Sequence, residues 1–415
     1  MTEFPVEFTT YTKGLFGEER WQRYVDSFSQ QVPVSIRRNP FKPVALNHLP
    51  IEREVPWCRD AWYLSERPNF TLDPLFHAGA YYVQEAASMF LDNILRQYCP
   101  ADFFQNGTAL DLCAAPGGKS TLLRAALPDG VLLMSNEPDR RRANILMENM
   151  QKQGHQEVVV TNNYPKDYAR TDMEFDLILT DVPCSGEGMF RKDDGAIGEW
   201  SLQNVMKCAA LQRSIIEEIW PRLRPGGILV YSTCTFNTHE NEENVRWIAE
   251  TLGAELLPVD IDARWGITES LLEGWTGPVY RFIPGITCSE GLFVAVMRKS
   301  PDSHYKCRPL NLRKAFGRLR ILSDGHPVGV QKGKSIIPAH AEALLAGLPA
   351  DRYARVELTH DEALRYLHHE AVVLPDTAPR GFVIVTYRQI PLGFVKNIGN
   401  RANNLYPQEW KIRNL

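Results

Sequence analysis

The segment ALDLCAAPGGKSTLLRAAL, residues 109 to 127, decides the fold class of this chain. Its apolar start, 109 to 112, has the length of a buried strand, and small residues then lead into a helical stretch at 119 to 127. Outward from this segment, strand-like and helical stretches continue to alternate. The further expected strands are 131–136, 157–161, 176–181, 228–233 and 292–297, and the further expected helices are 139–153, 203–222 and 239–252. This alternation predicts an α/β domain with a doubly wound, mainly parallel sheet.

Composition bounds the class of protein. A chain of 415 residues is too long for one ordinary domain, so we expect two or three. With 44% hydrophobic and 23% charged residues, it is not a mostly disordered, collagen-like or coiled-coil chain. No stretch approaches the ~18 to 20 apolar residues of a membrane span, and the start MTEFPVEF lacks the features of a secretory signal. We expect a cytoplasmic protein without membrane contact.

Composition shifts along the chain predict three units and a linker. Residues 1–100 look mixed and mostly helical, and we expect an accessory module there. Residues 101–300 hold the α/β core, whose last helix is expected to open with the acids Glu240, Glu242 and Glu243. Residues 301–319 are polar, basic and interrupted by proline, which is typical of a linker. Short β-like runs broken by glycine and proline in 320–415 predict a small β-rich domain.

The two parts of the chain have opposite charge. The whole chain has a net charge of -4, but residues 301–415 contain 17 Lys and Arg against 10 Asp and Glu, a net of +7. Residues 1–300 therefore carry -11. A basic module on an acidic body is compatible with a polyanionic partner such as nucleic acid, and equally with an ordinary solvated surface.

The glycine-rich segment after the first strand resembles a nucleotide-binding loop. Its small residues allow a ligand close to the backbone, and the following helix N-terminus favours an anionic group. The segment lacks the G-x-G-x-x-G and P-loop spacings, which disfavours nicotinamide and ATP, and a turn without a ligand stays an alternative. Glu137 follows the second strand, where a carboxylate can bind ribose hydroxyls, although it could also be an ordinary acid at a helix start.

Two of the eight cysteines follow consecutive strands of the predicted sheet. Cys184 comes after the strand that ends in Asp181, and Cys234 comes after 228–233. Because ligands bind beyond the carboxyl ends of parallel strands, both thiols should face one pocket. For the others outside the loop we expect packing as small apolar side chains: Cys58, Cys99, Cys208, Cys288 and Cys307. No C-x-x-C pair or zinc-type spacing is present, so we expect no metal.

A thiol beside a nucleoside-bearing cofactor suits one chemistry in particular. A thiolate that adds to C6 of a pyrimidine makes C5 nucleophilic enough to take a methyl group from a sulfonium donor. The step also needs a group that contacts the ring at N3 and N4, for which we expect Asp181, and a base that later removes the C5 proton. The residues by themselves leave open which of Cys184 and Cys234 attacks. A thiol redox protein is disfavoured, because its cysteines would be neighbours.

Three stretches together resemble a known family. DLCAAPGGKS (111–120), LILTDVPCSGEGMFRKD (177–193) and LVYSTCTFNTHENE (229–242) are similar to the RNA cytosine-C5 methyltransferases of the Nol/Nop/Sun type. The resemblance covers roughly residues 75 to 300, with a weaker likeness in SIRRNPFK, residues 35 to 42. The ending FVKNIGNRANNLYPQEWKIR resembles the PUA-like module of the bacterial RsmF-like subgroup. The resemblance implies a class I, Rossmann-like methyltransferase core, an N-terminal α+β module and a C-terminal β-rich PUA-like module, the two outer modules binding RNA.

The resemblance also assigns roles to individual residues. Cys234 is the implied nucleophile, Cys184 the residue that helps release the product, and Asp181 the cytosine contact. The implied contacts to S-adenosylmethionine are Cys113, Ala114, Ala115, Pro116, Gly117, Gly118, Lys119, Glu137, Arg142, Asn163 and Asp181. At Asn163 the chain departs from the family, which usually has an aspartate near the adenine, and Asn162 is the alternative match. An amide can still bond an adenine edge, so we expect altered contacts with retained cofactor use.

The implied substrate is ribosomal RNA or the small ribosomal subunit, bound by a chain that we expect to be a monomer. Alternatives are a transfer RNA methyltransferase with the same mechanism and a catalytically silent ribosome assembly factor. Arg191, Lys192 and the basic stretch 308–320 are candidates for phosphate contacts or for plain surface charge. Tyr82 and its neighbour Tyr81 are candidates for stacking on a base, or for core packing.

Overall fold

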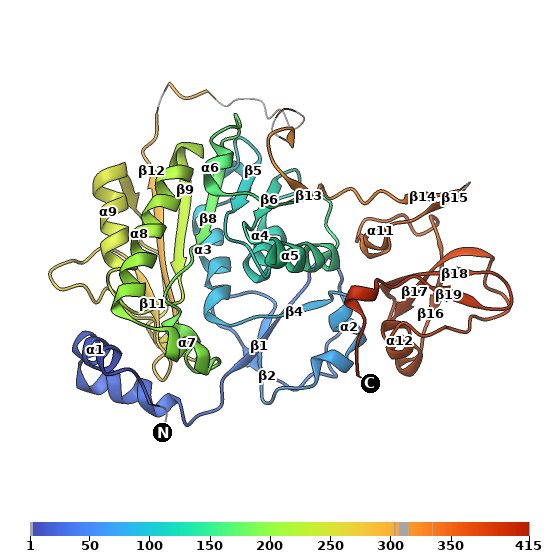
Figure 1. Cartoon of the computed structure of the whole chain (residues 1–415), viewed down its shortest axis with the longest axis horizontal. Coiled ribbons are helices and arrows are strands. Elements are labelled where there is room, and N and C mark those ends of the chain that lie inside the picture. Colours follow the sequence, from blue (N-terminus) through green and yellow to red (C-terminus); the bar gives the residue numbers. More distant parts are fainter. Residues whose placement is uncertain (1–2, 303, 307–313, 315, 334, 415) are drawn as a thin grey trace.

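The computed structural model describes residues 3–302, 304–306, 314, 316–333 and 335–414 (Figure 1). Its centre is a sheet of strand order β10-β12-β9-β8-β5-β6-β7-β13, with β11 paired to β12. The five parallel strands are β5 (Thr108–Asp111), β6 (Leu132–Asn136), β7 (Val158–Thr161), β8 (Phe175–Asp181) and β9 (Leu223–Thr233). The antiparallel strands are β10 (Ala254–Leu256), β11 (Tyr280–Phe282), β12 (Leu292–Lys299) and β13 (Ile321–Ser323). This topology confirms the predicted doubly wound, mainly parallel sheet.

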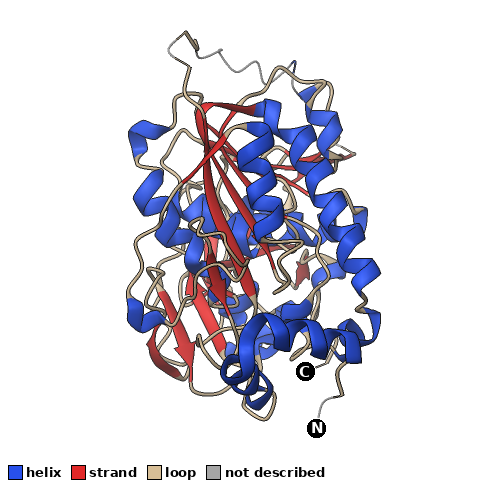
Figure 2. Ribbon diagram, turned by 90° about the vertical axis from the view of Figure 1, so that its left-hand side faces the viewer, coloured by secondary structure: helices blue, strands red, loops and turns tan. Residues whose placement is uncertain are grey.

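Helices cover both faces of the central sheet (Figure 2). Adjacent residues of a strand point to opposite faces. In β5, Ala109 belongs to one core cluster and Leu110 to the other. The first cluster includes side chains of α3 (Phe90–Tyr98), α4 (Gly118–Ala126) and α5 (Arg140–Gln153), and the second those of α6 (Pro165–Tyr168), α8 (Leu202–Ile219) and α9 (Glu242–Leu252). The sheet is buried on both sides, and its strand ends are left for ligands.

Two of the acids expected at the start of the last core helix, Glu242 and Glu243, lie in its first turn. Helix α9 begins at Glu242, two residues after Glu240, and both side chains are fully buried. The guanidinium of Arg281 pairs with the Glu242 carboxylate inside the protein. Glu242 and Glu243 lie in the first turn of α9, as expected, and Glu242 has a buried ion-pair partner in addition.

The N-terminal module contains more strand than its sequence suggests. Helix α1 (Val6–Ser27), with a break at Gly17, is followed by an antiparallel sheet of order β2-β3-β1-β4. Its strands are β1 (Val34–Arg38), β2 (Ile51–Glu54), β3 (Ala61–Leu64) and β4 (Tyr81–Val83), with α2 (Pro74–His77) before β4. Residues of β1 are buried almost throughout and those of β2 are all exposed. β2 lacks the alternation of apolar and polar residues that predicts a strand, and in β1, VSIRR, that alternation spans only four residues.

The C-terminal module packs against the N-terminal one (Figure 1). Its main sheet has the order β16-β17-β18-β19, and β14 pairs with β15. Side chains of this module share one core cluster with β1 and α2. The bounds of its elements are β14 (Val330–Lys332), β15 (Ser335–Ile337), α11 (His340–Leu344), β16 (Ala354–Glu357), α12 (His360–Leu367), β17 (Gly381–Tyr387), β18 (Ile390–Asn397) and β19 (Ala402–Asn404).

In the described part of the chain, no helix combines the length and the apolar character needed to cross a bilayer.

Candidate active site

A cavity of about 380 Å³ lies at the carboxyl ends of β5, β8 and β9. This volume is in the range of pockets that hold small molecules. The N-terminal module closes one side of it with residues 82–85 and Ser88. The expected site residues that line it are Cys113, Ala114, Ala115, Pro116, Gly118, Lys119, Asp181 and Cys234. The structure thus brings the glycine-rich loop, the Asp181 carboxylate and the Cys234 thiol to a single opening.

The two strand-end cysteines lie in direct contact. Their Sγ atoms are 3.1 Å apart, and the backbone N–H of Cys234 donates to the sulfur of Cys184 at 3.4 Å. Cys234 lines the cavity, and Cys184 is not among its lining residues. The hydrogen bond with Cys234, burial and the nearby negative charges raise the pKa of Cys184 well above its ordinary value. Cys184 is therefore a neutral thiol in contact with the sulfur of Cys234, and both residues are half-buried.

Asp181 is fixed from both sides at the end of β8. Its Oδ1 accepts a hydrogen bond from Ser232 Oγ at 2.7 Å, and its Oδ2 accepts one from Lys119 Nζ at 2.8 Å. Burial lowers the pKa of Lys119, but the Asp181 carboxylate more than offsets this and leaves that pKa raised. The pair places an oriented carboxylate and a charged amine in the cavity that Cys234 borders.

The Glu137 carboxylate has one oxygen atom that accepts no hydrogen bond from the described residues. Glu137, after β6, is only 2% exposed, and its Oε1 accepts from the backbone N–H of Asp139. Its Oε2 accepts no hydrogen bond from any described residue, and Arg142 Nη1 lies 3.5 Å away. Arg142 also donates to the carbonyl of Ala115 at 2.9 Å. A ribose hydroxyl would supply the missing donor, so this site fits the ribose of S-adenosylmethionine.

The side chain of Asn163 has partners for both of its polar atoms. Its Nδ2 donates to the carbonyl of Arg320, and its Oδ1 accepts from the backbone N–H of the same residue. Asn162 donates to the carbonyls of Glu137 and Pro138. These bonds orient the Asn163 side chain and leave it one N–H and one lone pair for a contact with an adenine.

A buried polar network holds the two cysteine loops together. The Glu240 carboxylate accepts from the backbone N–H of Ser185 and from the amides of Gln212 and Asn237. Burial raises the pKa of Glu240 to about 7. The Glu187 carboxylate likewise accepts from the backbone of Phe236 and Asn237 on the other loop. Sequence reasoning missed this network, because only the fold places the two loops side by side.

Gly188 shows how tightly these loops are packed. Its N–H donates to the carbonyl of Cys234 at 2.7 Å. A Cβ at this position would lie 2.8 Å from the Cα of Gly291 and 2.9 Å from the Cys234 carbonyl oxygen. The absence of a side chain here lets the loop after β8 support the loop that carries Cys234.

Several expectations need correction. Arg191 is neither a phosphate contact nor a surface charge, because its side chain is 5% exposed and pairs with buried Glu290 at 2.6 Å. Cys288 is exposed and not packed in the core, whereas Cys58 and Cys99 are buried as expected. Tyr81 donates to Asp73 in the module core. Of the expected basic stretch, residues 308–313 and 315, and likewise Cys307, lie outside the described residues.

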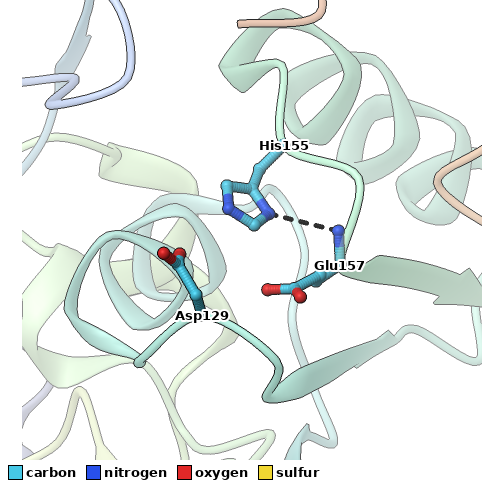
Figure 3. A group of neighbouring side chains, drawn as sticks. All are labelled: Asp129, His155 and Glu157. Atoms are coloured by element: carbon cyan, nitrogen blue, oxygen red, sulfur yellow. Dashed lines mark hydrogen bonds between the residues drawn. The ribbon is translucent and has the colours of Figure 1, made fainter. Parts of the chain in front are cut away.

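One group of side chains has the spacing of metal ligands (Figure 3). Asp129, His155 and Glu157 bring their ligand atoms within 4.8 Å of one another. These groups have other partners, because His155 Nδ1 accepts from the Glu157 backbone and the Glu157 side chain faces Arg124 at 3.3 Å. The buried guanidinium of Arg124 already places a positive charge beside Glu157 and would repel a metal ion there. We therefore assign no metal to the group.

Comparison with known proteins adds three family models and several relatives. The models are 16S rRNA methyltransferase RsmB/F at residues 102–298, the N-terminal domain of 16S rRNA methyltransferase RsmF at 4–86, and the methyltransferase RsmF PUA domain at 353–412. Ribosomal RNA small subunit methyltransferase F of Escherichia coli K12 is 32% identical over 417 residues, covering 86% of this chain and 84% of its own. The protein of the same name from Erwinia tasmaniensis is 29% identical and covers 98% and 96%.

Two solved structures resemble this chain in fold. A methyltransferase homolog protein from Pyrococcus horikoshii superimposes with a TM-score of 0.60 and 27% identity, over 72% of this chain and 96% of its own. NSun6 from Pyrococcus horikoshii, solved with SFG, has a TM-score of 0.60 at 21% identity, over 72% of this chain and 100% of its own. The second likeness supports the fold alone.

Proposed function

This chain belongs to the family of ribosomal RNA small subunit methyltransferase F, and from that premise we propose that it methylates C5 of a cytosine in 16S ribosomal RNA. The enzyme is an S-adenosylmethionine-dependent RNA methyltransferase. The observation that carries the assignment of the site is the contact between Cys184 and Cys234 beside Asp181 and the glycine-rich loop. We place the reaction in the cytoplasm.

The cofactor supplies an electrophilic sulfonium methyl group when bound. We assign its binding to the loop 113–119 and to Glu137, whose Oε2 accepts no hydrogen bond from the described residues and could accept one from the ribose. Asp181 lines the cavity that most of this loop borders. Arg142 supports the loop through the Ala115 carbonyl. The assignment of Asn163 to the adenine remains part of this proposal.

Cys234 is the nucleophile in this proposal. As a thiolate, its sulfur forms a bond to C6 of the cytosine, and the π electrons of the C5–C6 bond move to C5, which takes the methyl group. Asp181 contacts N3 and N4 of the ring while charge develops there, and Lys119 holds that carboxylate in place. Cys234 is the thiol that borders the cavity, which supports this assignment over Cys184.

Cys184 completes the reaction by acting as the base. Its pKa is raised chiefly by the hydrogen bond with Cys234, and the negative charge of that sulfur adds to the shift. Once Cys234 is bonded to C6, both causes disappear and the Cys184 thiol loses its proton more readily. The thiolate then takes the C5 proton, the sulfur–C6 bond breaks, and the electron pair returns to Cys234.

We propose that the outer units, residues 1–100 and 320–415, hold the RNA while the unit 101–300 carries out the chemistry. The match of residues 353–412 to the RsmF PUA domain supports the role of the last unit. Residues 301–319 are assigned as the linker between the two.

The test is methylation of 16S ribosomal RNA and of transfer RNA by the purified chain with radiolabelled cofactor, followed by bisulfite sequencing. The proposal predicts 5-methylcytosine in 16S RNA only. Methylation of transfer RNA alone would show that transfer RNA is the substrate. Binding of 16S RNA without methyl transfer would show that the chain is a ribosome assembly factor without catalytic activity.

A further inference from the structure

A second cavity, of about 180 Å³, lies where the N-terminal sheet meets α4 and α5. Arg37 of β1, Thr121 of α4 and Gln153 of α5 line it. Tyr82 and Val83 of β4 line both this cavity and the active-site cavity. The second cavity is therefore a direct neighbour of the reaction site, separated from it by one short strand.

Arg37 is a buried cation without an anion. Its side chain is enclosed by protein, with the residue only 4% exposed, and within the described part of the chain no carboxylate forms an ion pair with it. Its Nε donates to Gln84 Oε1 at 3.1 Å and its Nη2 to Thr121 Oγ1 at 2.8 Å, while Nη1 donates to no described residue. An unpaired buried charge is costly, and an anion that enters the cavity would offset the cost.

The remaining lining suits an anionic, partly aromatic ligand. No Asp or Glu lines the cavity, and its second cation, Lys152, already pairs with Glu148 at 2.6 Å. Gln153, 4% exposed, has an Oε1 that accepts no hydrogen bond from the described residues. The ring of Tyr82 offers a surface on which a base can stack. A free arginine, an open amide oxygen and an aromatic ring are the groups with which proteins bind single-stranded RNA.

We infer that this cavity is an RNA subsite that takes a nucleotide next to the target cytidine, with Arg37 Nη1 bonding its phosphate. The inference rests on the proposed function, because the strand must enter the active site for its neighbour to reach Arg37. In this inference Arg37 binds the phosphate. It also holds the N-terminal module against the core through its hydrogen bonds to Gln84 and Thr121. The test must separate these two roles.

The experiment compares the full-length wild-type chain with Arg37→Gln, Arg37→Lys and the control Arg38→Gln. Arg38 has the same charge on the same strand, but its side chain is 38% exposed and pairs with Asp60. With a 16S ribosomal RNA transcript as substrate, we expect Arg37→Gln to raise KM about tenfold to a hundredfold. It should also reduce the slope of log KM against log salt by about 0.7, the value for one phosphate of a single strand.

Further results are expected for the other variants. Arg37→Lys should recover part of the affinity and the slope, the Kd for S-adenosylmethionine should be unchanged in every variant, and Arg38→Gln should behave as the wild type. A slope unaltered by Arg37→Gln, or lowered equally by Arg38→Gln, would overturn the subsite. If the wild type does not methylate 16S RNA at all, the proposed function fails instead.

A second measurement avoids the risk that Arg37→Gln does not fold. A 16S transcript that contains 4-thiouridine at random positions is crosslinked to the wild-type chain, and the attached peptides are mapped. We expect crosslinks at lining residues that the active-site cavity does not share, which are Phe76, Gly79, Tyr81, Asn149, Lys152 and Gln153. Crosslinks confined to other segments would overturn the subsite even where the enzyme is active.

Discussion

The sulfur atoms of Cys184 and Cys234 lie 3.1 Å apart, although 50 residues separate them in the chain. Neighbouring strands β8 and β9 run parallel, with Asp181 opposite Ser232, and this register sets the two following loops side by side. Only one of the two sulfurs borders the cavity. The different roles that we propose for the two thiols rest on this difference in position.

Cys234→Ala should abolish methyl transfer, because the other thiol that lines the cavity, Cys113, belongs to the cofactor loop and burial raises its pKa. The measurement is incorporation of labelled methyl groups into 16S RNA, with cofactor binding followed by calorimetry to show that the site is intact. Turnover retained at a tenth of the wild-type rate or more would transfer the role of nucleophile to Cys184.

Cys184→Ala should stall the reaction after methylation, because the C5 proton then has no base. A protein–RNA adduct should accumulate and migrate as a slow band on denaturing gels. The double variant with Cys234→Ala should form no such band. A single variant that turns over without any adduct would remove the release role.

Asp181→Asn should lower kcat by about a hundredfold to a thousandfold, since it removes the carboxyl group that can donate a proton to the ring at N3 as charge develops there. Ser232→Ala is the matched control, because it deletes only the hydrogen bond to Asp181 Oδ1 and should cost about tenfold. Single-turnover kinetics with 16S RNA measure both. Equal losses would mean that Asp181 acts only as a structural acceptor.

Gly188→Ala should displace the Cys234 loop, because the added methyl group would lie 2.9 Å from the carbonyl oxygen of Cys234. We expect a loss of about a hundredfold in kcat, the cost of a misplacement near 1 Å. The Kd for S-adenosylmethionine should stay within threefold. Gly198→Ala in α7 (Asp194–Glu199) is the control, since its Cβ would meet no atom within 4 Å.

The buried Glu240 predicts a pH dependence of stability. Burial raises the pKa of its carboxyl group to about 7, above the unfolded value near 4.5. The folded state therefore binds the proton more tightly, and the stability that this contributes is complete below about pH 4.5 and is lost as the pH rises through about 7. Urea unfolding of the wild type and of Glu240→Gln should show a difference in free energy of unfolding that falls by up to about 3 kcal/mol from pH 5 to pH 8. A difference independent of pH would contradict the raised pKa.

The sequence by itself determined the core of this protein. The apolar runs of the central strands are long enough to be recognised, because both faces of the sheet are buried, and all six expected strands are present. The first outer module was harder to predict. Strand β1 is short, β2 is wholly exposed, and β13 follows the expected linker to pair with β7, so local patterns give little signal for them.

For the site, the sequence determined which side chains are present at the ends of the strands, since the glycine-rich loop and Asp181 each follow a recognisable strand. Only the tertiary structure decided which of them meet: Lys119 with Asp181, Cys184 with Cys234, and Glu240 with Ser185. Each of these contacts joins different loops or elements. Hydrogen bonds depend on distances of a few tenths of an ångström, which the packing of the whole chain sets and which no local pattern encodes.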